Sequence, residues 1–297
     1  MLHTAVLLLA FNRPAHTQKV LEVLHHVQPT RLYLAADGAR PTHPTDELNC
    51  AAVKQVLSNI PWQCEVKTLY HTQNLGCKTA VTQALNWFFT HEPHGIVLED
   101  DCMPHPSFFG FCEELLHHHQ HNPQITHIAG YNPLKSTEPP QSYFYTNIPL
   151  VWGWATWRRA WAQFTPITPE TLAQTPINFG WLPTMAAEYL KQKFWQTAHK
   201  KNNSWAYSWT FTQLKNGGLC IVPKKNLVQN IGFDETATHT QNKNRTHTQN
   251  PAQRLETPII HPLKAEINQK LAMEIFYKSQ KTKLRLIIWN IKRQLFK

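Results

Sequence analysis

Short apolar runs alternate with amphipathic stretches over the first 100 residues of the chain. Segments with the length of β-strands cover residues 5–11, 31–36, 64–70 and 95–98. Apolar residues at helical spacing lie between them, up to Val27 and over residues 46–59 and 79–90. This alternation predicts an α/β fold with a mainly parallel, twisted sheet flanked by helices. Ligands of such a fold lie beyond the carboxyl ends of the strands.

The pattern changes in the second third of the chain. A helix is expected over residues 107–120 and a short strand over residues 125–129. From Tyr143 onward the chain becomes rich in aromatic residues and loops, and a turn at residues 217–218 leads into a late strand. Fewer elements are therefore predicted here than in the first 100 residues.

The fourth apolar run stops at three consecutive acids, Glu99, Asp100 and Asp101. Adjacent carboxylates repel one another and cannot be buried without a compensating cation. Oxygen ligands at the carboxyl end of a strand suit a hard divalent ion such as Mg²⁺ or Mn²⁺, whose coordination substrate phosphates complete. A solvated acidic turn is the alternative, and these residues alone do not separate the two.

Composition narrows the function classes. The formal net charge of +10 over 297 residues suggests an anionic partner, although the lysines and arginines concentrate beyond residue 190. No apolar stretch long enough to span a membrane exists, no signal-peptide pattern precedes the first strand, and the six cysteines form no CxxC pair. These features favour a cytoplasmic protein with reduced thiols. The histidines at 117–119 and 121 fit a polar helix end better than a metal site, because consecutive residues point to different helix faces.

The end of the chain differs from the rest. We expect one domain over residues 1–240, followed over residues 241–297 by a polar loop and a basic amphipathic helical tail. Residues 281–297 place apolar side chains at helical spacing between cationic ends, with Trp289 among them. A helix at the surface of an anionic membrane fits this pattern, and so does a helix docked on its own domain.

Six short motifs occur in the same order in a bacterial family of GT-A-fold nucleotide-sugar glycosyltransferases, often labelled hemolytic-protein-like. They are Leu9–Pro14, Ala36–Gly38, Asn74–Lys78, Leu98–Asp101, Trp152–Trp157 and Gly232-Phe233 with Ala237–Thr240. The chain resembles this family over residues 3–240. It is more distantly similar to the N-acetylglucosaminyltransferase I type, which carries the same acidic triplet after its fourth strand. The resemblance implies transfer of a sugar from a nucleotide-diphosphate donor with Mn²⁺ or Mg²⁺.

The family pattern also implies roles for the acids and for one histidine. Asp101 would be the direct metal ligand, and His239 would complete the metal or diphosphate site. Glu99 and Asp100 would contact ribose, sugar or metal-bound water. The metal would neutralise the charge that develops on the leaving diphosphate.

Four further residues are expected at the donor. Asp37 would contact the nucleoside, or else serve as a turn aspartate before Gly38. Arg13 would contact phosphate or stack on a base, with a surface arginine as the alternative. Lys78 would hold the diphosphate as a point charge. Trp154 is expected to line the cleft and stack on a sugar, although most tryptophans of its motif should belong to the core.

One departure from the family pattern concerns the general base. Inverting transfer needs an acid close to the acceptor hydroxyl, and related families place it directly after a tryptophan. The matching position here is Ala206. Asp234 or Glu235 could substitute as the base, the reaction could follow another course, or the protein could bind donors without turning them over.

Together these features predict a metal-dependent glycosyltransferase that acts on a nucleotide-sugar, with UDP as the expected nucleotide. The acceptor would be a glycan or a lipid-linked glycan, with peripheral membrane contact through residues 281–297. A catalytically degenerate scaffold is the main alternative. Nucleic-acid binding is disfavoured because no recognition motif appears and the acidic triplet would oppose a phosphate backbone. A nicotinamide-dependent dehydrogenase is disfavoured because no GxGxxG follows the first strand.

Overall fold

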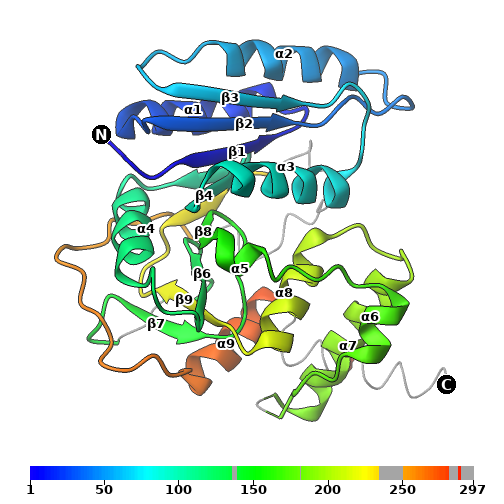
Figure 1. The fold of residues 1–297 in the computed structure, drawn as a ribbon, viewed down its shortest axis with the longest axis vertical. Helices are drawn as coiled ribbons and strands as arrows, with labels where there is room; N and C mark the ends of the chain where they lie inside the picture. Colours follow the sequence, from blue (N-terminus) through cyan, green and yellow to red (C-terminus); the bar gives the residue numbers. More distant parts are fainter. Residues whose placement is uncertain (136–138, 181, 234–249, 281–286, 289–297) are drawn as a thin grey trace.

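An eight-stranded sheet with helices on both faces organises the protein (Figure 1). The computed structural model describes residues 1–135, 139–180, 182–233, 250–280 and 287–288. The strands are β1 (Val6–Ala10), β2 (Arg31–Ala36), β3 (Glu65–Tyr70), β4 (His94–Glu99), β5 (Cys102–Pro104), β6 (Ile125–Ala129), β7 (Tyr143–Thr146), β8 (Trp154–Trp157), β9 (Leu219–Pro223) and β10 (Val228–Asn230). The helices are α1 (Pro14–Val27), α2 (Asp46–Ser58), α3 (Cys77–His91), α4 (Ser107–His118), α5 (Arg158–Trp161), α6 (Pro169–Gln174), α7 (Thr184–Ala198), α8 (Trp205–Asn216) and α9 (Gln269–Ser279).

The large sheet is mainly parallel, as the sequence predicts. Its order is β3-β2-β1-β4-β8-β6-β9-β7. The first four strands are mutually parallel, and β6 is parallel to β9. Strand β8 runs antiparallel between β4 and β6, and β7 is antiparallel to β9. This mixed α/β arrangement, a mainly parallel sheet flanked by helices, confirms the predicted fold class.

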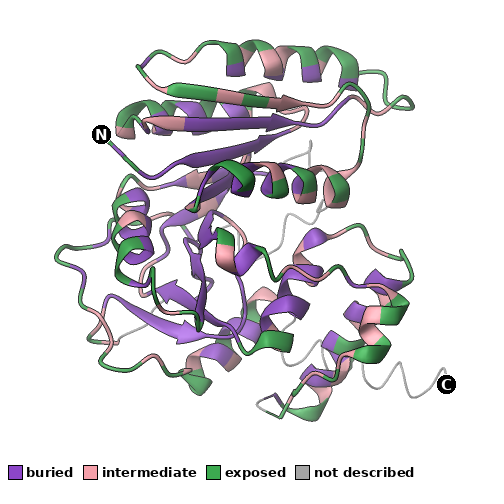
Figure 2. Ribbon diagram, in the orientation of Figure 1, coloured by how far each residue is buried: buried purple, intermediate pink, exposed green. Residues whose placement is uncertain are grey.

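Alternate residues of the central strands enter two separate cores, because successive side chains of a strand point to opposite faces. In β1, Val6 and Leu8 pack with α1, α2 and α4, whereas Leu7 and Leu9 pack with α3, α5 and α8. Figure 2 shows the resulting buried central strands and the exposed outer surfaces of the helices. Burial on both faces explains why these strands are continuous apolar runs in the sequence.

The carboxyl ends of the first four strands lie in register. Ala36 pairs with both Ala10 and Tyr70, and Glu99 pairs with Leu9. The loops that follow β1, β2, β3 and β4 therefore begin at the same edge of the sheet. This edge carries Arg13, Asp37 and the acidic triplet of residues 99–101.

The prediction that Trp154 lines a cleft is wrong. Its side chain is completely buried, with ring centroids 5.0 Å from His127, 5.7 Å from Trp205 and 5.9 Å from Trp209. The reason is its place in β8, a central strand covered on both faces, which the motif alone did not reveal. Trp152, two residues earlier, lies outside the strand and contacts solvent.

Residues 250–280 pack onto the sheet and are part of the domain core. The backbone N–H of Ser142 donates to Ile260 O at 2.8 Å, and Ile267 bridges to Tyr145 in β7. Ile275 and Phe276 of α9 are fully buried. This segment belongs to the region that the sequence assigns to a polar loop and tail, so part of that region extends the domain.

The predicted amphipathic tail, residues 281–297, lies outside the described residues except for 287–288. Across the part of the chain that the structure describes, every helix is too short or too polar to cross a membrane.

A neutral histidine lies at the centre of the aromatic core. The indole N–H of Trp209 donates to Nδ1 of His127 at 3.2 Å, so the ring proton resides on Nε2, which lies 3.0 Å from Leu150 O. Burial lowers the pKa of His127 from 6.5 to about 4. The folded protein therefore favours the uncharged ring.

Stability should consequently fall in mild acid. A histidine whose pKa is lower in the folded than in the unfolded state contributes stability above pH 6.5, and this contribution is lost as the pH falls toward 4. We expect the free energy of unfolding to decrease by up to about 3 kcal/mol over this window from His127. Urea unfolding at several pH values should show a flatter profile for His127→Gln and an unchanged one for the exposed-site control His121→Gln. An equally steep profile in His127→Gln would contradict this assignment.

Candidate active site

A cavity of about 400 Å³ lies at the carboxyl edge of β3, β2, β1 and β4. Its walls come from the loops after these strands, from the first half of α3 and from two distant segments around Asn203 and Asn230–Phe233. Predicted site residues among its lining are Arg13, Asp37, Glu99, Asp100 and Asp101. The four-strand register thus brings together residues that are up to 88 positions apart.

The acidic triplet lines the end of the cavity next to the carboxyl end of β4. Asp100 is buried, and its Oδ2 accepts a hydrogen bond from the backbone N–H of Phe11 at 3.1 Å. Burial raises the pKa of the Glu99 and Asp100 carboxyls, and the negative charge of Asp101 raises both further. Negative charge is therefore costly here unless a cation is added.

Arg13 provides one such cation. Its Nη1 lies 3.0 Å from Oδ2 of Asp101, and the two side chains are only 9% and 19% exposed. Asn230 Nδ2 donates to the other Asp101 oxygen at 3.3 Å. Gly232 packs so closely that a Cβ there would overlap Asp101 Oδ2 and lie 2.7 Å from Arg13 Nη1. The ion pair is thus enclosed by the segment that follows β10.

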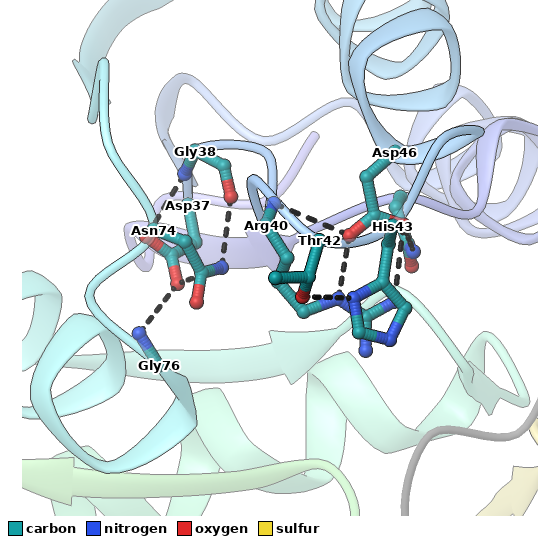
Figure 3. A network of polar contacts seen from close by, with 9 residues as sticks. Asp37, Gly38, Arg40, Thr42, His43, Asp46, Asn74 and Gly76 are labelled. Atoms are coloured by element: carbon teal, nitrogen blue, oxygen red, sulfur yellow. Dashed lines mark hydrogen bonds and ion pairs between the residues drawn. The ribbon is translucent and has the colours of Figure 1, made fainter.

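Asp37 holds a loop in place. Its Oδ1 accepts hydrogen bonds from the backbone N–H groups of Gly38 and Leu75, each at 2.9 Å. Its Oδ2 accepts from Asn74 Nδ2 and from the Gly76 N–H, each at 3.0 Å (Figure 3). Four donors match the capacity of one carboxylate. Of the two roles left open by the sequence, the structure therefore supports the turn aspartate, which shapes the wall of the cavity.

A second polar network at the rim was missed by sequence reasoning. Asp46 is buried and accepts hydrogen bonds from the Arg40 guanidinium and from Asn12 Nδ2, the latter at 2.7 Å (Figure 3). These bonds, Arg40 first, lower the pKa of Asp46 to about 2. Arg40 also lies over the Phe11 ring at 5.3 Å. Only the folded loop between β2 and α2 shows that Arg40 and Asp46 belong together at the cavity.

The end of the cavity next to the carboxyl ends of β3 and β2 is lined by small side chains, by His71 and by the polar residues Asp37, Arg40 and Asn74. The small residues are Ala10, Ala36, Ala80 and Ala84. His71 follows β3, and its Nε2 is buried with no hydrogen-bond partner among the described residues. A buried ring nitrogen without a partner costs free energy unless a ligand supplies one. This end therefore suits a flat group with a polar edge. Position after a strand end was the only sequence signal for His71.

Other predicted residues lie apart from the cavity lining or outside the description. Lys78 occupies the first turn of α3, half-buried and outside the lining. Ala206 lies in the first turn of α8 and packs against the aromatic core. Asp234, Glu235 and His239 fall outside the described residues, directly after the cavity residues Gly232 and Phe233.

Three carboxylates line the acidic end of the cavity, and their oxygen atoms are the ligand type that a hard divalent cation prefers. One of them, Asp101, is paired with Arg13. Within the described ranges, no three His, Cys, Asp or Glu side chains already form a metal-binding geometry. Metal binding would thus need some rearrangement of the Asp101–Arg13 pair or a ligand from elsewhere. Metal dependence remains a prediction.

Comparison with known proteins gives likenesses at the level of structure alone. No protein-family model and no curated protein sequence matches the chain. HddC from Yersinia pseudotuberculosis complexed with GMP-PN aligns at 13% identity and TM-score 0.30, covering 48% of this chain and 60% of HddC. The 4-diphosphocytidyl-2C-methyl-D-erythritol synthase from Anaerococcus prevotii aligns at 8% identity and TM-score 0.34, covering 59% and 79% of the two chains.

A third similar structure is mouse xyloside xylosyltransferase 1 in its apo form. It aligns at 12% identity and TM-score 0.32, and the alignment covers 72% of this chain and 82% of the mouse chain. At these identities and TM-scores, the likenesses assign neither substrate nor reaction to this protein.

Proposed function

We propose that this protein is a glycosyltransferase that uses a nucleotide-diphosphate-sugar, with UDP as the expected nucleotide. The observation that carries the proposal is the two-ended cavity. One end has small side chains and the unpartnered Nε2 of His71, and the other has three carboxylates and Arg13. A nucleobase fits the first end by shape and hydrogen bonding, and a diphosphate with its counter-ions fits the second.

The residues at the acidic end would perform distinct tasks. Asp101 would hold a divalent metal, with His239 as a further predicted ligand, and the bound metal would supply Lewis-acid stabilisation of the leaving diphosphate. Arg13, which is paired with the Asp101 carboxylate, would also contact phosphate oxygens of the donor. Phe11 N–H holds Asp100 in place through a hydrogen bond. Lys78 remains a predicted phosphate contact from the start of α3.

The general base is the open part of this mechanism. The carboxylates among the described cavity residues are Asp37, Glu99, Asp100 and Asp101, and each has a role or environment that makes it a poor base for an acceptor hydroxyl. Asp234 and Glu235 follow the cavity wall in sequence and are our proposed bases. A donor-binding scaffold without turnover is the alternative, and Ala206 at the usual base position favours it.

A panel of nucleotide-sugars tests the proposal. Binding and slow hydrolysis should be measured with Mn²⁺ and with a chelator. We expect one donor class to bind in a metal-dependent manner and to be hydrolysed slowly. Binding without hydrolysis, even with candidate glycan acceptors present, would support the scaffold. Absence of binding for the whole panel would contradict the proposed donor site.

His71 provides a separate prediction. His71→Ala should weaken nucleotide binding about three- to tenfold, because one buried hydrogen bond is lost. The loss should be equal for the nucleoside diphosphate and the nucleotide-sugar, since the contact is to the base. His3→Ala, before β1 at the opposite edge of the sheet, is the matched control. Isothermal titration calorimetry measures both ligands, and a loss confined to the nucleotide-sugar would place His71 at the sugar instead.

The acceptor is proposed to be a glycan or a lipid-linked glycan. We also propose attachment to an anionic membrane through residues 281–297, of which the structure describes only 287–288. Deleting this segment should reduce sedimentation with anionic vesicles if the prediction is right.

A further inference from the structure

A second hollow, of about 510 Å³, lies between α6 and α7 on the part of the molecule away from α1 and α2 (Figure 1). Phe179 and Trp195 supply aromatic walls. Leu172, Ile177 and Phe194 add apolar side chains, and Thr175, Gln192 and Glu188 are polar residues of the same lining. Its volume is in the range of small-ligand sites. Apolar walls with interspersed polar groups match a pyranose ring, which has apolar faces and a rim of hydroxyls.

The aromatic wall is accessible. Trp195 is 44% exposed, a large fraction for an indole. It lies on one side of α7 in a row with Lys191 and His199, which are four residues before and after it. His199 stacks on it with ring centroids 4.3 Å apart, and Lys201 Nζ lies 4.4 Å from the ring centroid. His199 and Lys201 therefore cover part of the indole, and the residue still lines the hollow.

The rim of the hollow is cationic. Lys191 lines it, and Lys200 and Lys201 are exposed just beyond the end of α7. Glu188 is the lining carboxylate, and it lies 3.0 Å from Lys191 Nζ. With Lys191 in the lining and Lys201 against the Trp195 ring, two lysines face one lining acid, and this excess of positive charge favours a ligand that carries negative charge.

A short segment of the polypeptide connects the α6–α7 hollow with the candidate active site. Helix α7 ends at Ala198, and the turn that follows reaches Asn203, which lines the active-site cavity. Asn203 Nδ2 also lies 3.1 Å from the position of a Cβ on Gly76, at the start of α3. The segment that follows α7 therefore forms part of the wall of the active-site cavity.

We propose that the α6–α7 hollow binds an acidic oligosaccharide, as a remote subsite for the acceptor. The role as an acceptor subsite rests on the proposed glycosyl transfer, whereas the binding of the oligosaccharide does not. A flat anionic membrane is the less suitable partner, because lipid would desolvate Thr175 and Gln192 without offering hydrogen bonds. Sugar hydroxyls would satisfy those groups.

The test uses defined oligosaccharides and surface variants. Tetragalacturonic acid is the acidic probe, and maltotetraose is the neutral probe of equal length. Binding is measured by calorimetry for wild type, Trp195→Ala and Lys191→Ala. Lys19→Ala and Leu48→Ala, at exposed positions of α1 and α2, control for loss of one charge and one exposed apolar side chain. Affinity for the nucleotide-sugar is measured in parallel in every variant.

We expect Trp195→Ala and Lys191→Ala to weaken tetragalacturonate binding about fivefold or more, and the two controls to leave it unchanged. Maltotetraose should bind more weakly than the acidic probe. Nucleotide-sugar affinity should stay unchanged in all four variants. If wild type binds the acidic probe as expected but binds no nucleotide-sugar, the proposed function fails while the glycan site stands.

Three results would overturn the subsite. Wild type could fail to bind tetragalacturonate, or the controls could lose as much affinity as Trp195→Ala, which would indicate non-specific attraction by a cationic protein. In the third, Trp195→Ala would abolish binding to phosphatidylcholine vesicles that contain phosphatidylglycerol but leave oligosaccharide binding intact. That outcome would assign this face to a membrane.

Discussion

Asp101→Asn is expected to lower metal-dependent hydrolysis of the nucleotide-sugar by roughly two orders of magnitude, the typical loss when a charge-stabilising group is removed from an active site. The amide keeps the shape and one oxygen of the carboxylate, but it removes the charge that pairs with Arg13 at 3.0 Å. The Mn²⁺ concentration needed for half-maximal rate should rise in parallel, because a neutral ligand binds a hard cation poorly. Steady-state rates over a Mn²⁺ titration measure both effects.

Two controls make this result interpretable. Glu47→Gln removes a carboxylate from an exposed position of α2 and should change neither rate nor metal requirement. Thermal unfolding of Asp101→Asn reports any loss from the unpaired Arg13, which is only 9% exposed. A folded variant with a rate within twofold of wild type would remove Asp101 from the catalytic site and would leave Glu99 and Asp100 as the metal candidates.

The two neighbouring tryptophans should separate stability from binding. Trp154→Ala is expected to lower the free energy of unfolding by about 3–5 kcal/mol, since it opens a cavity in a fully buried aromatic cluster. Trp152→Ala should cost less stability, because Trp152 is half-buried. The Trp152→Ala change should instead weaken donor or acceptor binding several-fold, since Trp152 lines the active-site cavity. The centroids of the Trp152 and Phe233 rings are 5.5 Å apart. Urea unfolding and calorimetry on both variants provide the comparison.

Trp154→Phe is the milder variant, to be measured in case Trp154→Ala does not fold. We expect it to be less stable than wild type but to bind the nucleotide-sugar normally when folded. Normal stability with lost binding would restore the cleft role that the motif suggested.

The contrast between these tryptophans shows what the sequence could and could not predict. Strands β1, β2 and β4 were predictable because burial on both faces makes them apolar runs, and their ends were marked by polar residues such as Asp37 and Glu99. The antiparallel strand β8 was not, because its four residues Trp154–Trp157 resemble an aromatic loop until β4 and β6 are placed on either side.

Site residues divide in the same way. Carboxylates at strand ends were identified because the register of parallel strands brings such ends together. The hydrogen-bond partners of Asp37 could not be identified from the sequence, because Asn74, Leu75 and Gly76 approach it only after β3 has paired with β2. The Arg40–Asp46 pair and the unpartnered nitrogen of His71 likewise depend on burial, which a sequence pattern does not report.

The antiparallel ribbon of β5 and β10 ties the acidic triplet to the segment before Gly232. Ile231 N–H donates to Asp101 O at 2.8 Å, and Gly232 leaves no room for a side chain beside the carboxylate. Moving this site to another protein of the same architecture would therefore require residues 99–104 and 228–233 to be transplanted as one unit. Grafting either half alone would misplace the other, however well its own residues were chosen.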